Sequence, residues 1–216
     1  MITWIRYYRV QSGKDDELAR KLRTAAQPGL ETLASEKKVL GWGVAVPLSQ
    51  NDDSWTHLLW VDFADWAAVD AFVDTLTNLE LQAAVARDVF LRHMAEPDAP
   101  SAVKARYVAV HMHWITRGRD EDALALFHEW AKPVFVELAE AGKVGAWALM
   151  TEDTAVTGDW RYLVRYPITE LAVLDDVTTT LMKFEMPRLM SFELRLREMS
   201  GQNYRGQIWR VLHSAP

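Results

Sequence analysis

Hydrophobic and polar positions follow two patterns along this chain of 216 residues. Residues 2–10 and 107–115 are rich in β-branched and aromatic residues without helical spacing, which is typical of strands. After each of them, apolar residues recur every three to four positions, as in an amphipathic helix. These two helices are expected to end near Glu36 and near Ala141. Each contains one proline, at which we expect a kink or a restart.

The rest of the chain predicts further elements of the same two kinds, separated by polar turns. We expect further strands at 39–46, 55–63, 102–106, 144–150, 160–166 and 207–212. We expect further helical segments at 65–77, 79–93, 170–181 and 182–199. The segment Glu96-Pro-Asp-Ala-Pro-Ser is the expected linker.

The second half of the chain resembles the first at an offset of 105 residues. Without gaps, roughly nineteen identities align over some 110 positions, where chance would give roughly seven. The aligned identities include Pro28/Pro133, Trp42/Trp147, Trp55/Trp160, Leu91/Leu196, Arg92/Arg197 and Met94/Met199. We therefore predict an internal repeat with two domains, 1–100 and 101–216, in which the duplicated tryptophans pack in the cores.

Each half has the order strand, helix, strand, strand, helix, strand, which is that of the ferredoxin-like unit. Such a sheet has helices on one face only, and its other face must find a partner. The third strand of the first half is apolar on both sides, which indicates that both faces are covered. We therefore predict an α+β fold of two tandem ferredoxin-like repeats whose antiparallel sheets pack face to face.

This pattern resembles the dimeric α/β barrel superfamily in its single-chain tandem form. The first repeat is most similar to NIPSNAP-like domains. The residues that carry this similarity are Arg6 and Tyr8, the Gly13-Lys14 turn, Gly41-Trp-Gly and His57-Leu-Leu-Trp, although Gln11-Ser12 stands where a proline would precede the glycine. The resemblance implies a pseudo-dimeric α/β barrel. Superfamily members include cofactor-free monooxygenases of polycyclic phenols, haem-binding and haem-degrading enzymes, isomerases and decarboxylases, so the fold does not select one activity.

Composition and motifs exclude several classes of function. The chain has no cysteine, which rules out disulfides, thiolate metal sites and a cysteine nucleophile. A net charge of −6 argues against nucleic acid as a partner. No apolar run is long enough to span a membrane, and no signal peptide is readable, so we expect a cytoplasmic location. No dinucleotide loop, zincin motif or serine-hydrolase elbow occurs.

Candidate catalytic residues lie on the first strand of each half. His111 and His113 are two residues apart, so strand alternation places them on one face, and their equivalents in the first half are Arg6 and Tyr8. In a face-to-face arrangement these four side chains could approach one another and recognise an anion or a phenolate. One histidine could then act as a general base. A polar cluster without function and a two-histidine metal site are the alternatives, and we expect no metal there.

Candidate ligand-binding residues lie on the third strands and among the tryptophans that are not duplicated. His57 and Tyr162 occupy equivalent positions, so the two halves differ chemically at that point. Trp60 and Trp114 could line a pocket for a flat hydrophobic ligand, although core packing is the alternative for both.

The sequence favours a protein that binds a hydrophobic or aromatic small molecule in an aromatic-lined pocket between sheet and helices. Its enzymatic version is the oxygenation or rearrangement of an aromatic substrate without a cofactor. In that version His111 or His113 is the base and Arg6 stabilises the anion. The alternatives are a haem-binding protein with a histidine ligand and a non-catalytic scaffold. Whether the chain is an enzyme, and whether it forms a homodimer, stay open.

Overall fold

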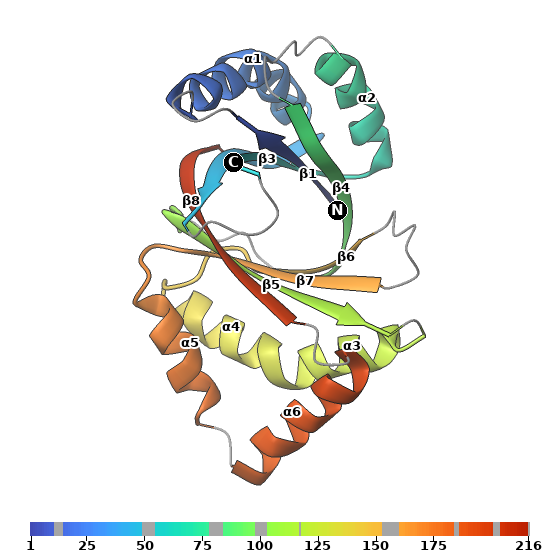
Figure 1. The fold of residues 1–216 in the computed structure, drawn as a ribbon, viewed down its shortest axis with the longest axis vertical. Coiled ribbons are helices and arrows are strands. Elements are labelled where there is room, and N and C mark those ends of the chain that lie inside the picture. Colours follow the sequence, from blue (N-terminus) through green and yellow to red (C-terminus); the bar gives the residue numbers. More distant parts are fainter. Residues whose placement is uncertain are drawn as a thin grey trace. The chain divides into compact units, whose positions relative to one another are not determined.

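A computed structural model describes residues 1–10, 15–48, 55–77, 84–97, 103–116, 118–152, 160–183, 186–200 and 204–215. These residues form two compact units, each made of an antiparallel sheet and helices (Figure 1). Unit 1 comprises Met1–Arg92 with Trp209–Pro216, and unit 2 comprises His93–Ile208. The end of the chain joins unit 1 because the last strand pairs with a strand of that unit. The repeat, the domains 1–100 and 101–216 and the face-to-face packing of the sheets stay predictions.

Unit 1 has the element order predicted for a ferredoxin-like unit. Its elements are β1 (Ile2–Arg9), α1 (Asp15–Ser35), β2 (Val39–Pro47), β3 (His57–Phe63), α2 (Trp66–Thr77) and β4 (Ala84–Ala95). The strands lie in the order β4-β1-β3-β2, and neighbouring strands are antiparallel. Both helices lie on the same side of this sheet (Figure 1). The end of β8 (Tyr204–Ala215) extends the sheet beyond β2.

The core of unit 1 lies between the sheet and its two helices. The even-numbered residues of β1 face this core, since the Trp4 ring meets the Phe72 ring of α2 edge to face at 5.6 Å. Helix α1 contributes the stripe that its sequence spacing predicts, in which Leu22, Ala26 and Leu30 are completely buried. The burial of this stripe explains why the amphipathic segment forms a helix here.

Unit 2 follows the same order with one additional helix. Its elements are β5 (Tyr107–Ile115), α3 (Asp120–Leu126), the π-helical turn η1 (Phe127–Ala131), α4 (Lys132–Glu140), β6 (Ala148–Glu152), β7 (Trp160–Ile168), α5 (Val173–Leu181) and α6 (Met186–Ser200), followed by the start of β8. Strand β7 lies between β5 and β6 and is antiparallel to both. Helices α3 to α6 lie on one side of these strands (Figure 1). Among the described residues of unit 1, no helix corresponds to α6.

The first helical segments of the two units differ in regularity. Helix α1 is continuous through Pro28, so the chain does not restart there. In unit 2 the chain forms α3, one π-helical turn and then α4, with Pro133 in the first turn of α4. The N–H group of Lys132 bonds to the carbonyl of Phe127, five residues earlier, which widens the helix at this point. The restart expected at Pro133 is therefore present.

Two expectations from the sequence fail in the region after α2. Residues 79–93 were expected to be helical, but Ala84–Ala95 is strand β4; residues 79–83 lie outside the described ranges. Strand β4 pairs with β1 from Ile2↔Arg92 to Arg9↔Ala84, and these hydrogen bonds outweigh the helical propensity of the segment. The strand expected at 102–106 is also wrong, because residues 103–106 form none and residue 102 is not described.

The helices in the described ranges do not have the properties of membrane-spanning helices. None of the helices there combines the length and the apolar character that a bilayer-spanning helix needs.

Candidate functional site

Unit 2 contains a pocket between its sheet and its helices. The pocket has a volume of about 100 Å³, which grows to about 480 Å³ when the space open to solvent at its mouth is included. Its walls are mostly aliphatic and aromatic side chains from β5, β6, β7, α3, η1 and α6. The lining residues are His113, Ile115, Ala123, Leu126, Phe127, Ala131, Leu149, Tyr162, Val164, Phe192, Leu196 and Met199. A pocket of this character favours an apolar ligand.

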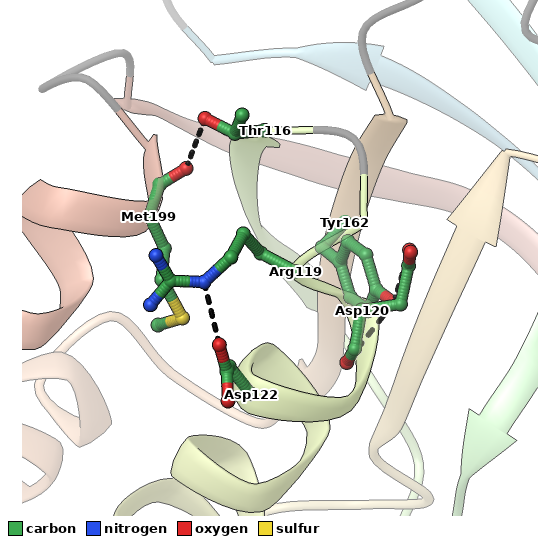
Figure 2. Close-up of polar contacts among 6 residues, drawn as sticks. All are labelled: Thr116, Arg119, Asp120, Asp122, Tyr162 and Met199. Atoms are coloured by element: carbon green, nitrogen blue, oxygen red, sulfur yellow. Dashed lines mark hydrogen bonds and ion pairs between the residues drawn. The ribbon is translucent and has the colours of Figure 1, made fainter.

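Helix α6 forms one wall of the pocket and is fixed at two points. At its C-terminal end, the Met199 carbonyl accepts hydrogen bonds from the backbone N–H and from Oγ1 of Thr116, at 2.8 and 2.9 Å (Figure 2). One turn earlier, Nη1 of Arg195 lies 2.9 Å from Oε2 of Glu129, which belongs to η1. The additional helix of unit 2 is thus tied both to β5 and to the π-helical turn that lines the same pocket.

Two polar side chains, those of His113 and Tyr162, lie in the pocket wall. They are directly opposite each other on β5 and β7. The Tyr162 hydroxyl donates a hydrogen bond to Oδ1 of Asp120 at 2.9 Å, at the first residue of α3 (Figure 2). Burial, this hydrogen bond and the negative charge of Asp120 all raise the pKa of Tyr162, so the phenol stays protonated.

The two histidines of β5 are both uncharged at neutral pH. Burial, together with the neighbouring His111, lowers the pKa of His113 to about 4. Burial also lowers the pKa of His111. His111 Nε2 lies 2.7 Å from the hydroxyl of Tyr166, and the two rings are nearly parallel. Which of these two groups donates depends on the tautomer of His111.

The corresponding place in unit 1 holds the same pair of residue types in exchanged positions. Tyr8 on β1 is directly opposite His57 on β3. The Tyr8 hydroxyl is buried and makes no hydrogen bond of good geometry within the described residues. Burial raises the pKa of Tyr8 to about 12, and the nearby Arg6 guanidinium partly opposes this increase. Arg6 itself binds Asp88 through two hydrogen bonds of 2.7 and 2.8 Å.

The predicted site residues therefore fall into three groups. His113 and Tyr162 line the pocket of unit 2, and His111 lies on the same face of β5. Arg6, Tyr8 and His57 lie on the helix-covered face of unit 1, since they share the strand faces of its core residues. Trp60 and Trp114 lie on the opposite faces of their strands.

The structure does not bring the four predicted catalytic side chains together between two open sheet faces. Arg6 and Tyr8 face the helices of unit 1, whereas His111 and His113 face the helices of unit 2. The predicted meeting point requires the opposite strand faces. The expectation failed because strand alternation shows which residues share a face but not which face the helices cover.

Two parts of the site were missed in the sequence. Asp120 was not singled out, because its bond to Tyr162 joins residues far apart in the chain. Phe192 and Leu196 were placed in a helical segment without a partner. The spacing of apolar residues in that segment indicates a helix with one buried face, but it does not indicate which part of the protein that face contacts.

Comparison with known proteins shows similarity in structure only. The sequence matches no family model and no curated protein. Two solved structures, each described as a "putative monooxygenase", are similar over the whole chain. That from Fusobacterium nucleatum has 13% identity and a TM-score of 0.63, covering 99% of this chain and 93% of that one. That from Lactobacillus acidophilus has 12% identity and a TM-score of 0.62, covering 99% and 95%.

A heme-binding protein from Thermus thermophilus is also similar, with 10% identity, a TM-score of 0.56, and coverage of 98% of this chain and 91% of that one. This chain therefore shares the fold of these proteins. At such low identity, these similarities carry no activity over to this chain.

A haem group does not fit the pocket of unit 2. Pockets for drug-sized ligands occupy roughly 300–1,000 Å³, whereas this one has about 100 Å³ inside its mouth. Phe192, Leu196 and Met199 of α6 are part of the wall that bounds this space. In the part of the chain that the structure describes, no three His, Asp or Glu side chains gather as a metal-binding group.

Proposed function

We propose that this protein binds a hydrophobic or aromatic small molecule in the pocket of unit 2. One observation carries the proposal: an apolar cavity between sheet and helices has two opposed polar side chains, His113 and Tyr162, in its wall. Apolar surface supplies affinity, and a few polar groups supply orientation. The fold occurs in proteins described as monooxygenases and as a heme-binding protein, which agrees with small-molecule binding but does not specify it.

The catalytic form of this proposal is the oxygenation or rearrangement of an aromatic substrate without a cofactor. His113 would have to remove a proton from a phenol, whose pKa is near 10, with an imidazole whose pKa is about 4. Arg6, the residue expected to stabilise the resulting anion, is bound to Asp88 in unit 1. The described residues therefore support ligand binding more directly than base catalysis.

Tandem duplication is the proposed origin of the two units. The segments 15–35 and 120–140 have equal length and differ by the predicted offset of 105 residues. The cross-strand pairs Tyr8↔His57 and His113↔Tyr162 obey the same offset. The NIPSNAP-like assignment, the cytoplasmic location and a homodimer stay expectations from the sequence.

Filling the pocket tests the proposed function. Ala123 lines the pocket and is nearly buried, and the residue at the equivalent position of unit 1 is leucine. We expect 4-fluorotoluene to bind the wild-type protein, as measured by ¹⁹F NMR. Ala123→Leu should weaken this binding at least about tenfold, because the added carbon atoms occupy the cavity.

Ala141→Leu is the matched control, because Ala141 is exposed at the end of α4 and lies outside the pocket. This variant should bind the probe like the wild type, and thermal unfolding should show that both variants fold. The proposed function is wrong if the wild type binds no apolar probe, or if Ala123→Leu binds it as tightly as Ala141→Leu does.

A further inference from the structure

We propose that the ligand of the unit 2 pocket is a single-ring molecule with a hydroxyl group and no negative charge, and that Tyr162, oriented by Asp120, recognises this hydroxyl. The inference rests on the proposed function and deepens it by naming the class of ligand. Size, charge and hydrogen-bonding capacity support it separately.

The size of the pocket limits the ligand to about one ring. An engineered cavity of about 150 Å³ in another protein binds benzene, and the pocket of unit 2 has about 100 Å³ with an open mouth. Two fused rings would displace Phe192 or Leu196 of α6. That helix is fixed at Thr116 and at Glu129, so displacing it breaks contacts that a single ring leaves intact.

The charges around the pocket disfavour an anionic ligand. No lysine, arginine, aspartate or glutamate lines it. The nearby cations are held in ion pairs instead: Nε of Arg119 lies 2.5 Å from Asp122 (Figure 2), and Arg195 binds Glu129. An anionic ligand would lose its hydration without gaining a partner of opposite charge, and the nearby Asp120 carboxylate would repel it, so its binding is disfavoured.

The hydrogen bond from Tyr162 to Asp120 determines which ligand group can be recognised. The Tyr162 hydroxyl donates its only hydrogen to the Asp120 carboxylate (Figure 2). Its oxygen can therefore take part in a further hydrogen bond only as an acceptor. A ligand hydroxyl can donate to this oxygen, whereas a ligand carbonyl cannot. A ligand with a hydroxyl group therefore meets the requirement that the Tyr162 oxygen sets.

Asp120 is therefore a positioning residue that acts through Tyr162. A hydrogen bond to a carboxylate is roughly twice as strong as one between neutral groups. It fixes the rotation of the Tyr162 hydroxyl and increases the negative charge on its oxygen. Loss of the Asp120 charge should change which ligand is preferred, and not only how stable unit 2 is.

Three fluorinated probes of similar size test the inference: 4-fluorophenol, 4-fluorotoluene and 4-fluorobenzoate, each titrated by ¹⁹F NMR. With wild-type protein we expect 4-fluorophenol to bind about fivefold more tightly than 4-fluorotoluene, the ratio expected for one additional hydrogen bond. We expect 4-fluorobenzoate to bind at least about 50-fold more weakly than 4-fluorophenol.

Variants then identify the residues that recognise the hydroxyl. Tyr162→Phe should abolish the preference for 4-fluorophenol while 4-fluorotoluene still binds, which also shows that unit 2 is folded. Asp120→Asn should reduce the preference to about twofold. Tyr8→Phe is the matched control, because it removes another buried tyrosine hydroxyl, in unit 1, and should leave the fivefold preference unchanged.

The outcomes separate this inference from the proposed function. If 4-fluorotoluene binds and Ala123→Leu blocks it, but 4-fluorophenol is not preferred or 4-fluorobenzoate binds comparably, the inference is overturned and the proposed function stands. If Tyr162→Phe keeps the preference, the assignment to Tyr162 is wrong. If no probe binds the wild type, both proposals fail.

Discussion

Unit 1 and unit 2 place the same pair of residue types under their helices but differ in the space around it. In unit 1, Tyr8 and His57 are each 1% exposed. In unit 2, His113 and Tyr162 line a cavity. The comparison shows that one arrangement of strands can bury this pair, with Tyr8 in a core cluster as in unit 1, or place both residues in a pocket wall, as in unit 2.

Two features of unit 2 account for its cavity. Ala123 and Val164 line the pocket at positions where unit 1 has the larger residues Leu18 and Leu59. The π-helical turn η1 replaces a regular stretch of helix, and such turns often occur at functional sites. Helix α6 then covers the cavity that smaller side chains and a widened helix leave.

Truncation of the duplicated tryptophans should have the largest effect. Trp42 and Trp147 are each 1% exposed, so Trp42→Ala and Trp147→Ala should each lower the free energy of unfolding by about 3–5 kcal/mol. Trp147 contacts the pocket residue Phe127, with ring centroids 5.7 Å apart. We therefore expect Trp147→Ala to weaken 4-fluorotoluene binding and Trp42→Ala to leave it unchanged.

Urea unfolding and ¹⁹F NMR check these two effects. Equal loss of binding in both variants would show that the pocket does not belong to unit 2 alone. A negligible loss of stability in either variant would contradict the core positions of these tryptophans.

A glycine-to-alanine exchange in β2 should have an intermediate effect that depends on the position of the glycine. A Cβ atom at Gly43 would overlap the Trp60 ring and lie 2.6 Å from the His213 carbonyl oxygen. At Gly41 it would meet only ordinary contacts of 3.6 Å or more. Gly43→Ala should therefore lower the free energy of unfolding by about 1–3 kcal/mol, and Gly41→Ala by less than about 1 kcal/mol.

Unit 2 has Ala148 at the position equivalent to Gly43, and this alanine is buried, with 2% of its surface exposed. Equal unfolding midpoints for Gly41→Ala and Gly43→Ala in urea would contradict the close contact of Trp60 with β2.

His113 and Tyr8, which occupy equivalent positions in the two units, should make the free energy of unfolding depend on pH in different ranges: His113 at acidic pH and Tyr8 at alkaline pH. His113 has a pKa of about 4 in the folded protein, below its usual 6.5, so only the unfolded chain binds its proton between these values. Its contribution to stability is complete above pH 6.5 and is lost as the pH falls toward 4, by at most about 1.4 kcal/mol per pH unit. His113→Phe should reduce the slope in this window, and the slope from His111 should remain.

Tyr8 has the opposite sign of pH dependence. Its pKa of about 12 exceeds the usual 10, so its contribution is complete below pH 10 and is lost as the pH rises toward 12. Tyr8→Phe should flatten that alkaline window alone. Unfolding by urea at a series of pH values measures both slopes, and slopes unchanged by these substitutions would contradict the burial of the pair.

The spacing of hydrophobic residues predicted most of the helices and strands, because most of them bury one apolar face against a neighbouring element. The strand β5 and the equal helical segments 15–35 and 120–140 follow directly from this spacing. The failure at β4 has a physical cause. The segment contains good helix formers such as Ala, Leu and Arg, and only pairing with the distant β1 makes it a strand.

The repeat alignment also shows where sequence identity misleads. Leu91, Arg92 and Met94 align with Leu196, Arg197 and Met199. The first set lies in strand β4 and the second in helix α6. Identical residues thus adopt different structures, because the partners that surround them differ.

The candidate site was predictable only in part. Strand position and chemistry singled out His113 and Tyr162, which line the pocket. Their pairing with Asp120, and the wall formed by α6, depend on contacts between distant segments, which no local pattern encodes.

Methionine methyl groups give the most direct test of the central claim, that unit 2 binds its ligand in the pocket beneath α6. Met199 lines the pocket and is 2% exposed, whereas Met182 and Met190 are 60% and 62% exposed. With ¹³C-methyl-methionine protein and saturating 4-fluorophenol, we predict intermolecular nuclear Overhauser effects from the ring protons to the Met199 methyl group. Effects to Met182 or Met190 without any to Met199 would place the ligand on the surface and contradict the account.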